Sequence, residues 1–284
     1  MLISCEAIPV TEFTDRPVVC CYLSEGEVPV LNVKKLIPFQ GDAQFSDEDV
    51  DRLDITITDL TSGEEFRLSG TDNGNYSNDG LIPVSGHEYR LDFMYDGVAV
   101  TSTTQVPSAP VNVTFSSSTI EVMGGMPPMP MSKAPHEGIE ISWDNEEGDY
   151  YIIEGKTTST STIQDYDDDD ELPSKSFKHN YTQGSSTSLS SSDFNYYGTY
   201  TISVSHIRYE YAVMSQGGST SSTTLVDVKG NIDGGYGIFT GISSVKKSIR
   251  VYRNRCFISG YWEIGLKVMQ NESIKIKKIN QIIL

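Results

Sequence analysis

The sequence predicts an all-β protein. Its 284 residues are rich in Ser, Thr, Tyr, Gly, Asp and Val, a mixture that favours strands and turns over helices. Short segments in which apolar and polar residues alternate are separated by turn signals, which is typical of β-sandwiches and open barrels. A proline-bearing segment at residues 106–110 divides this pattern in two. We therefore expect two immunoglobulin-like or fibronectin III-like β-sandwich domains in tandem.

The first expected domain covers residues 16–107. It begins with the β-prone run RPVVCCYL, and the segment LDITITDL shows the period-two alternation of a half-buried strand. Asp96-Gly97 is a tight-turn signal between two alternating segments. The strands expected here cover residues 16–23, 28–35, 53–60, 65–70, 89–93 and 98–100.

The second expected domain covers residues 108–251 and begins at VNVTF. Residues 123–135 cannot form regular structure because they contain four prolines and two glycines. Trp143, followed by a turn and a strand with Tyr151, is similar to the early strands of a fibronectin III or immunoglobulin-like sandwich, where a buried Trp anchors the core. Residues 157–193 are expected to form a solvated acidic and Ser/Thr-rich insertion. The longest strand-like run covers residues 196–215.

Charge and cysteine content exclude several classes of protein. The net charge of −18 disfavours nucleic acid as a partner. The last 39 residues carry nine basic and two acidic residues, so residues 252–284 are expected to be a basic tail on an acidic body. The acidic block at residues 165–171 lacks the glycine turn of an ordered calcium loop, and the cysteines and histidines show no zinc spacing. We expect no metal and no cofactor.

The first residues resemble the end of a bacterial lipoprotein signal. Leu-Ile-Ser precedes Cys5, and in such signals that cysteine is acylated and becomes the mature N-terminus. Residues 1–15 are therefore interpreted as a lipobox remnant and tether, although the apolar region of a complete signal does not precede Cys5. Acylation at Cys5 would hold the protein to a membrane without spanning it.

A glycine-rich segment near residue 235 completes the set of landmarks. LVDVKGNIDGGYGIFTGISSV predicts a tight turn that leads into a final core strand. Together with the lipobox cysteine, RPVVCCYLSEGE and GHEYRLDFMYDGVAVTSTTQVP, it resembles an uncharacterised outer-membrane lipoprotein family of Bacteroidota, the domain of unknown function 4249. The resemblance implies two β domains on the outer membrane, at the cell surface. It also implies a position beside a SusC-like TonB-dependent transporter and its SusD-like lipoprotein, which import peptides or glycans.

From these observations we expect a non-enzymatic accessory lipoprotein of such an importer, since no catalytic signature is present. The alternative is a lipidated pilin- or adhesin-type subunit that polymerises by strand donation. Methionines in the segment 123–135 and several tyrosines are the candidate contacts for a peptide or glycan ligand, or for a partner. These candidates are Met126, Met129, Met131, Tyr166, Tyr196 and Tyr197.

Overall fold

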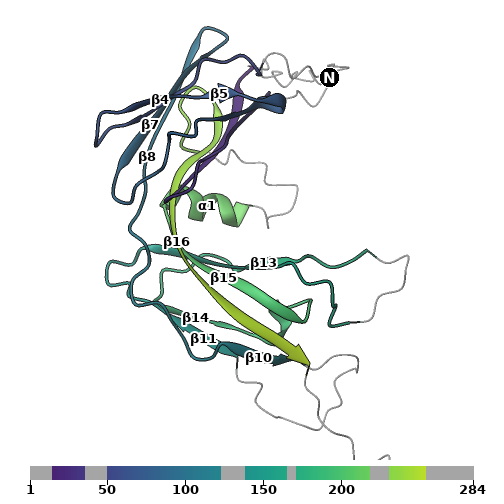
Figure 1. The fold of residues 1–284 in the computed structure, drawn as a ribbon. Helices are drawn as coiled ribbons and strands as arrows, with labels where there is room; N and C mark the ends of the chain where they lie inside the picture. The colour runs from purple at the N-terminus through teal and green to yellow at the C-terminus, as the bar shows by residue number, and fades with distance from the viewer. Residues whose placement is uncertain (1–14, 36–49, 123–137, 165–170, 218–229, 254–284) are drawn as a thin grey trace, which may run out of the picture.

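The computed structural model describes residues 15–35, 50–122, 138–164, 171–217 and 230–253. The predicted all-β class is confirmed, because the described chain consists mainly of strands in several sheets together with one α-helix, α1 (Tyr209–Gly217). Two sandwich units lie one above the other in Figure 1, and α1 lies between them.

The first unit is built from the N-terminal strands. Their bounds are β1 (Pro17–Ser24), β2 (Leu31–Lys35), β3 (Thr56–Asp59), β4 (Glu65–Arg67), β5 (Ser69–Gly70), β6 (Asn75–Ser77), β7 (Glu88–Tyr95) and β8 (Val98–Gln105), with a 3₁₀ turn at Asp72–Gly74. One layer has the order β1-β2-β6-β5 and the other β4-β3-β7-β8. The predicted strand at residues 65–70 is divided between the layers. Buried Leu68 lies between β4, which pairs with β3, and β5, which pairs with β6.

The second unit is built from the remaining strands. Their bounds are β9 (Thr114–Phe115), β10 (Thr119–Val122), β11 (Ile139–Ser142), β12 (Tyr150–Thr157), β13 (Ser176–Lys178), β14 (Ser186–Leu189), β15 (Gly198–Ile207) and β16 (Tyr236–Arg253), with a 3₁₀ turn at Ser191–Asp193. One layer has the order β13-β12-β15-β16 and the other β14-β11-β9, while β10 pairs with the end of β16. The predicted strand at 196–215 ends at Ile207, after which α1 forms.

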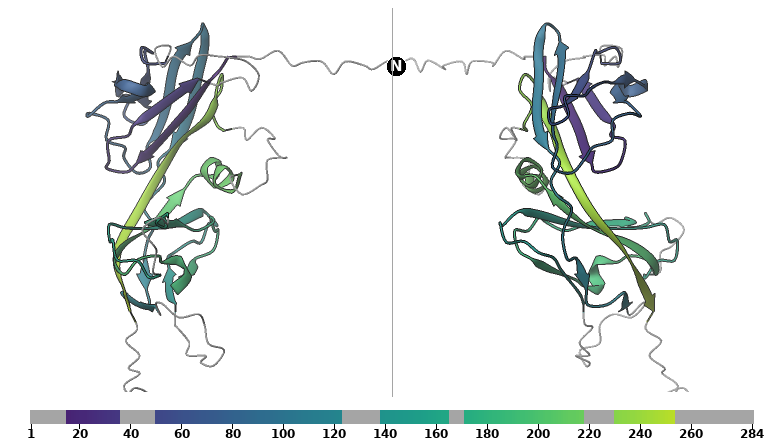
Figure 2. Two further views of the ribbon diagram at one scale, coloured as in Figure 1. Left: turned by 90° about the vertical axis from the view of Figure 1, so that its right-hand side faces the viewer. Right: turned by 60° about the vertical axis from the view of Figure 1, so that its left-hand side comes forward.

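Strand β16 belongs to both units. Its first part, from Tyr236 to Ile242, pairs in parallel with β1, and from Ile242 to Val251 it pairs antiparallel with β15. In Figures 1 and 2 it runs from the first unit into the second as one continuous arrow. The first unit therefore contains a segment from outside residues 16–107, the range expected from the sequence. The reason is long-range pairing, which no local pattern in the sequence reveals.

Each unit has its own apolar core and a hydrogen-bonded tyrosine at the start of a strand. The hydroxyl oxygen of Tyr200 accepts from the backbone N–H of Tyr196 at 3.0 Å, and that of Tyr89 accepts from the N–H of Val84 at 2.9 Å. Both arrangements match the tyrosine corner of immunoglobulin-like sandwiches. Trp143 is buried as predicted, with its ring 5.2 Å from that of Tyr151.

The structure corrects the expectation for residues 157–193 and confirms the expected turn at Asp96-Gly97. The segment 157–193, expected as a solvated insertion, contains β13 and β14, because Phe177 and Leu189 pack against the second core. Residues 165–170 of that segment, and residues 254–284 of the expected basic tail, lie outside the described residues. The Asp96-Gly97 turn is confirmed between β7 and β8, with positive φ at both residues.

Candidate functional site

The glycine-rich landmark fastens β16 to the first unit. The Asn231 side chain donates to the carbonyl oxygen of Phe239 at 2.6 Å and accepts from the Phe239 N–H at 3.0 Å, as a neighbouring strand would. The backbone groups of Asp233 and Thr101 exchange hydrogen bonds of 2.8 and 3.0 Å, which ties the same segment to β8. Gly237 has a φ of +103°, and a Cβ there would lie 1.9 Å from the carbonyl oxygen of Val19. The landmark therefore has a structural role.

Five tyrosines surround α1 on the outer side of the shared sheet, the side away from both cores. We call this set the tyrosine face: Tyr22, Tyr150, Tyr181, Tyr209 and Tyr211. The Tyr22 and Tyr211 rings are 5.3 Å apart, while Tyr150 lies 5.4 Å from Tyr181 and 5.7 Å from Tyr209. Tyr209 is 62% exposed and Tyr22 38% exposed, so the set offers aromatic surface to solvent.

Strand alternation determines which side chains form this face. On β1, Val19, Cys21 and Leu23 enter the first core, so Tyr22 points to the other side of the sheet. On β12, Tyr151 and Ile153 enter the second core, which places Tyr150 on the outer side. Cys20 and Cys21 follow the same rule and point to opposite sides of β1. Cys21 is buried and Cys20 partly exposed, and both are free.

Helix α1 is fixed to both units. The Glu210 carboxylate accepts from the hydroxyl of Thr104 in β8 at 3.2 Å and from the hydroxyl of Thr240 in β16 at 3.3 Å. On the other side of the helix, Ala212 is fully buried in a small cluster with Ile152 and Ile207. These contacts hold Tyr209 and Tyr211 at defined positions.

One cation belongs to the tyrosine face. The Lys178 ammonium group donates to the Tyr211 hydroxyl at 2.7 Å and lies 4.5 Å from the centre of that ring. The same group is 3.6 Å from a carboxylate oxygen of Glu154. Burial, followed by the nearby Cys20, raises the pKa of Tyr22, so this phenol is neutral at physiological pH. The face thus presents aromatic rings together with a cation that is paired with Glu154.

Three histidine–aspartate pairs connect loops of the sandwiches. His87 contacts Asp59 at 2.7 Å, and His179 contacts Asp193 at 3.0 Å. Both ring nitrogens of His206 are engaged, one with the carbonyl oxygen of Ser108 and the other with Asp149. Burial alone would raise the pKa of Asp59, but hydrogen bonds from His87, Ser62 and Thr61 outweigh it and hold that pKa below its ordinary value. These pairs join separate segments of the chain and are typical of structural contacts.

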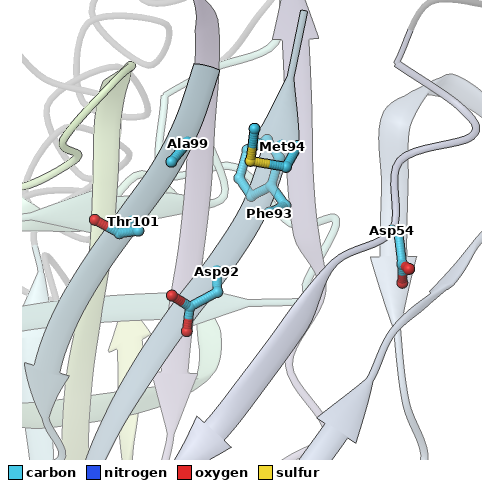
Figure 3. Close-up of a pocket in the computed structure, with 6 residues that line it drawn as sticks. All are labelled: Asp54, Asp92, Phe93, Met94, Ala99 and Thr101. Atoms are coloured by element: carbon cyan, nitrogen blue, oxygen red, sulfur yellow. The ribbon is translucent and has the colours of Figure 1, made fainter. Parts of the chain in front are cut away.

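The hollows in the described surface are open to solvent. One of about 290 Å³ lies over β7 and β8, and Figure 3 shows Asp92 and Thr101 on these neighbouring strands, with Asp54 set apart from them. Asp92 pairs with Arg90, and Asp54 pairs with Arg67. A second hollow, of about 320 Å³, lies at the junction and is lined by residues that include Arg208 and Glu210. The described residues contain no group of three or more metal-ligating side chains.

The structure places two of the predicted contact residues. Tyr196 was expected to be available to a ligand, but it is 1% exposed and its hydroxyl donates to the carbonyl oxygen of Pro173 at 2.8 Å. The ring of Tyr196 is packed inside the second core, so the expectation that it contacts a ligand is wrong. Tyr197 is half-buried against the same core, and its hydroxyl oxygen has no partner among the described residues. Four further candidate contacts and the expected lipidation site lie outside the described residues: Met126, Met129, Met131, Tyr166 and Cys5.

Sequence reasoning did not find the tyrosine face. Its members come from β1, β12, α1 and the segment after β13, so they are scattered along the chain. The one local signal is Tyr209-Glu210-Tyr211, directly after a strand whose alternation ends at Ile207. A short helix at that point would have indicated an aromatic cover over the sheet.

One comparison with known proteins agrees with the sequence landmarks. The family described as "Domain of unknown function (DUF4249)" matches residues 6–248. No curated protein matches this chain. Among solved structures, the extracellular domains 3–5 of Drosophila OTK are similar over 87% of this chain and 66% of that one, with 12% identity and a TM-score of 0.16. The described residues contain no helix with the length and apolar character that a bilayer span requires.

Proposed function

The chain belongs to the DUF4249 family, and from this premise we propose that it is a non-enzymatic accessory lipoprotein of a SusC/SusD-like TonB-dependent importer. In this role Cys5 carries the lipid anchor, and the two β units stand at the surface of the outer membrane. The importer takes up peptides or glycans. The accessory protein holds the complex together or helps to capture the nutrient. The importer context follows from the resemblance of the sequence landmarks.

The tyrosine face is the observation that supports a binding role. Tyrosines offer a large contact area with few rotatable bonds, and they are enriched among the residues that dominate binding energies. Here they are mounted on a sheet and a helix that hydrogen bonds and buried apolar contacts fix to both units, so little order has to be gained on binding. A rigid aromatic surface on a tethered protein suits an accessory subunit.

Co-purification tests the proposal directly. The natively produced protein is extracted in mild detergent, and we expect a large outer-membrane barrel to accompany it. Tyr209→Ala removes the most exposed ring of the tyrosine face and should reduce the amount of barrel recovered several-fold. Met94→Ala, at a side chain of similar exposure on the opposite sheet of the first unit, is the control. A protein recovered alone, as a clean monomer, would count against the importer role.

Lipidation is tested separately by mass spectrometry. We expect the natively produced N-terminal peptide to begin at Cys5 and to carry fatty acyl chains. A bare Cys5 thiol in protein that is free in the periplasm or cytosol would contradict the anchor.

The alternative role as a pilin- or adhesin-type subunit makes a different prediction. Polymerisation by strand donation needs an unpaired strand edge that a neighbouring copy can fill. In the described chain, the outer edge of β1 is paired with β16 of the same molecule. Some strands at the ends of the described sheets, such as β13, do have an unpaired edge. Ladders of SDS-resistant polymers on unboiled gels would favour the subunit role.

A further inference from the structure

We infer that the outer side of the shared sheet, together with the tyrosine face, binds an acidic surface of a neighbouring protein. This inference deepens the proposed accessory role, on which it rests, because it states which surface meets the partner and what charge the partner presents. It is carried by the distribution of cations over the strands.

The outer side of the sheet is basic although the protein is acidic. The described residues include 24 acidic and 14 basic side chains, a net charge of −10. The charged residues at outward positions of the strands in this sheet have the opposite balance. We call the five cations among them the basic set; two carboxylates, Glu154 on β12 and Glu121 on β10, lie at outward positions beside them. The basic set consists of Lys34, Lys156, Lys178, Lys246 and Arg250.

Strand register places these cations on one side. Lys246 lies opposite Ser203, which is flanked on β15 by the core residues Ile202 and Val204. Lys156 follows Gly155 on β12, where a Cβ would collide with the core ring of Phe177. Arg250 lies between the core residues Ile249 and Val251 on β16, so it must point outwards as well.

Three members of the basic set are free to meet a partner. Lys178 and Lys246 form ion pairs with Glu154 at 3.6 Å and Glu27 at 2.8 Å. Lys34, Lys156 and Arg250 are exposed, and within the described ranges they form no ion pair. Uncompensated cations attract acidic surfaces and accelerate association with them.

The dimensions of the face suit a protein. Lys34 pairs with Val18 of β1, and Val18 pairs on its other side with Tyr236 of β16. Arg250 lies 14 residues after Tyr236 on β16. At ~3.3 Å per residue this corresponds to a span of about 46 Å. The hollows described above are lined by none of the five tyrosines or five cations. A long surface of this kind, with aromatic residues at its centre and charges around them, is typical of protein interfaces, whereas small ligands are held in concave sites.

Binding of acidic polymers to the full-length protein tests the charge. Poly-L-glutamate is the probe, and poly-L-lysine, polygalacturonate and anionic lipid vesicles are the comparators. We expect poly-L-glutamate to bind with an affinity that decreases as salt increases. The double variant Lys156→Glu, Arg250→Glu should weaken this binding at least tenfold. The double variant Arg52→Glu, Arg67→Glu makes the same change in net charge in the first unit, away from the basic set, and should weaken it less than threefold.

A second probe tests the tyrosines. A glutamate–tyrosine copolymer can use both parts of the surface, so Tyr209→Ala should weaken its binding while leaving poly-L-glutamate binding unchanged. Circular dichroism checks that each variant is folded, which we expect because all substituted side chains are exposed.

Several outcomes would overturn the inference. Equal losses in the two double variants would show that only net charge matters. Tighter binding to polygalacturonate or to vesicles would assign the surface to a glycan or a membrane. Binding seen only after Asp167–Asp170 are replaced by asparagine would assign it to the chain's own acidic segment. If the Lys156→Glu, Arg250→Glu variant still recovers the barrel as the wild type does, this surface is wrong and the accessory role stands.

Discussion

Replacing Asn231 by alanine would remove both hydrogen bonds between its side chain and the backbone of Phe239 in β16. These two bonds substitute for the hydrogen bonds that a neighbouring strand would make. The groups left behind are the N–H and carbonyl of Phe239, a residue with 0% exposure. An unpaired buried polar group costs about 1–3 kcal/mol. Because Asn231 itself is half-buried, water can reach part of the vacated space, so we expect a total loss near the lower end, roughly 2–4 kcal/mol.

Urea unfolding followed by circular dichroism measures this loss. For a chain of this size it corresponds to a decrease in Tm of roughly 4–16 °C. Asn195→Ala is the matched control, because the Asn195 side chain donates one exposed hydrogen bond to the carbonyl oxygen of Ser174, and its loss should cost less than about 1 kcal/mol. Equal unfolding midpoints for the Asn231→Ala variant and the wild type would refute the stabilising role of the Asn231 side chain.

Three further predictions follow from burial and backbone geometry. Gly237→Ala should lower the free energy of unfolding by more than about 3 kcal/mol, because its Cβ would collide with the carbonyl oxygen of Val19. Gly148 also has a positive φ but lies in open space, so Gly148→Ala should lower the free energy of unfolding by about 1 kcal/mol. The midpoints of urea unfolding compare the two variants. Burial raises the pKa of four tyrosines above 10, so their contribution to stability is complete below pH ~10 and is lost as the pH rises further. The absorbance of tyrosinate should therefore increase together with unfolding. An increase in the absorbance of these four phenols without unfolding would contradict this prediction. These are Tyr76, Tyr89, Tyr151 and Tyr200. Burial also raises the pKa of Cys21, so native-state alkylation mapped by mass spectrometry should modify Cys20 and spare Cys21; labelling of both at equal rates would contradict the register of β1.

The sharing of β16 also bears on cooperativity. Its 18 residues form hydrogen bonds with strands of both units, so unfolding either unit removes a partner strand from the other. The proposed role benefits from this connection, because a surface that extends over both units keeps its shape only while their shared strand holds them together.

Signals within short stretches of the sequence were enough to predict the local structure of this protein. Alternation predicted strands at residues 53–60 and 89–93, Asp96-Gly97 predicted the tight turn that follows, and the glycine landmark predicted the start of a final strand. These features depend on residues within about ten positions of one another, where side-chain periodicity and turn preferences act directly.

How the strands combine depends on long-range pairing, which is visible in the fold and not in the local sequence. Cys21 pairs with Phe239 across more than 200 residues, and a period-two pattern specifies the face of a strand without specifying its neighbour. The helix at 209–217 replaced part of a strand-like run because Ala212 fits the small apolar cluster beside Ile152 and Ile207. The tyrosine face exists for the same reason. Its residues are distant in the chain, and the fold brings them together by placing α1 on the outer side of a sheet that two units share.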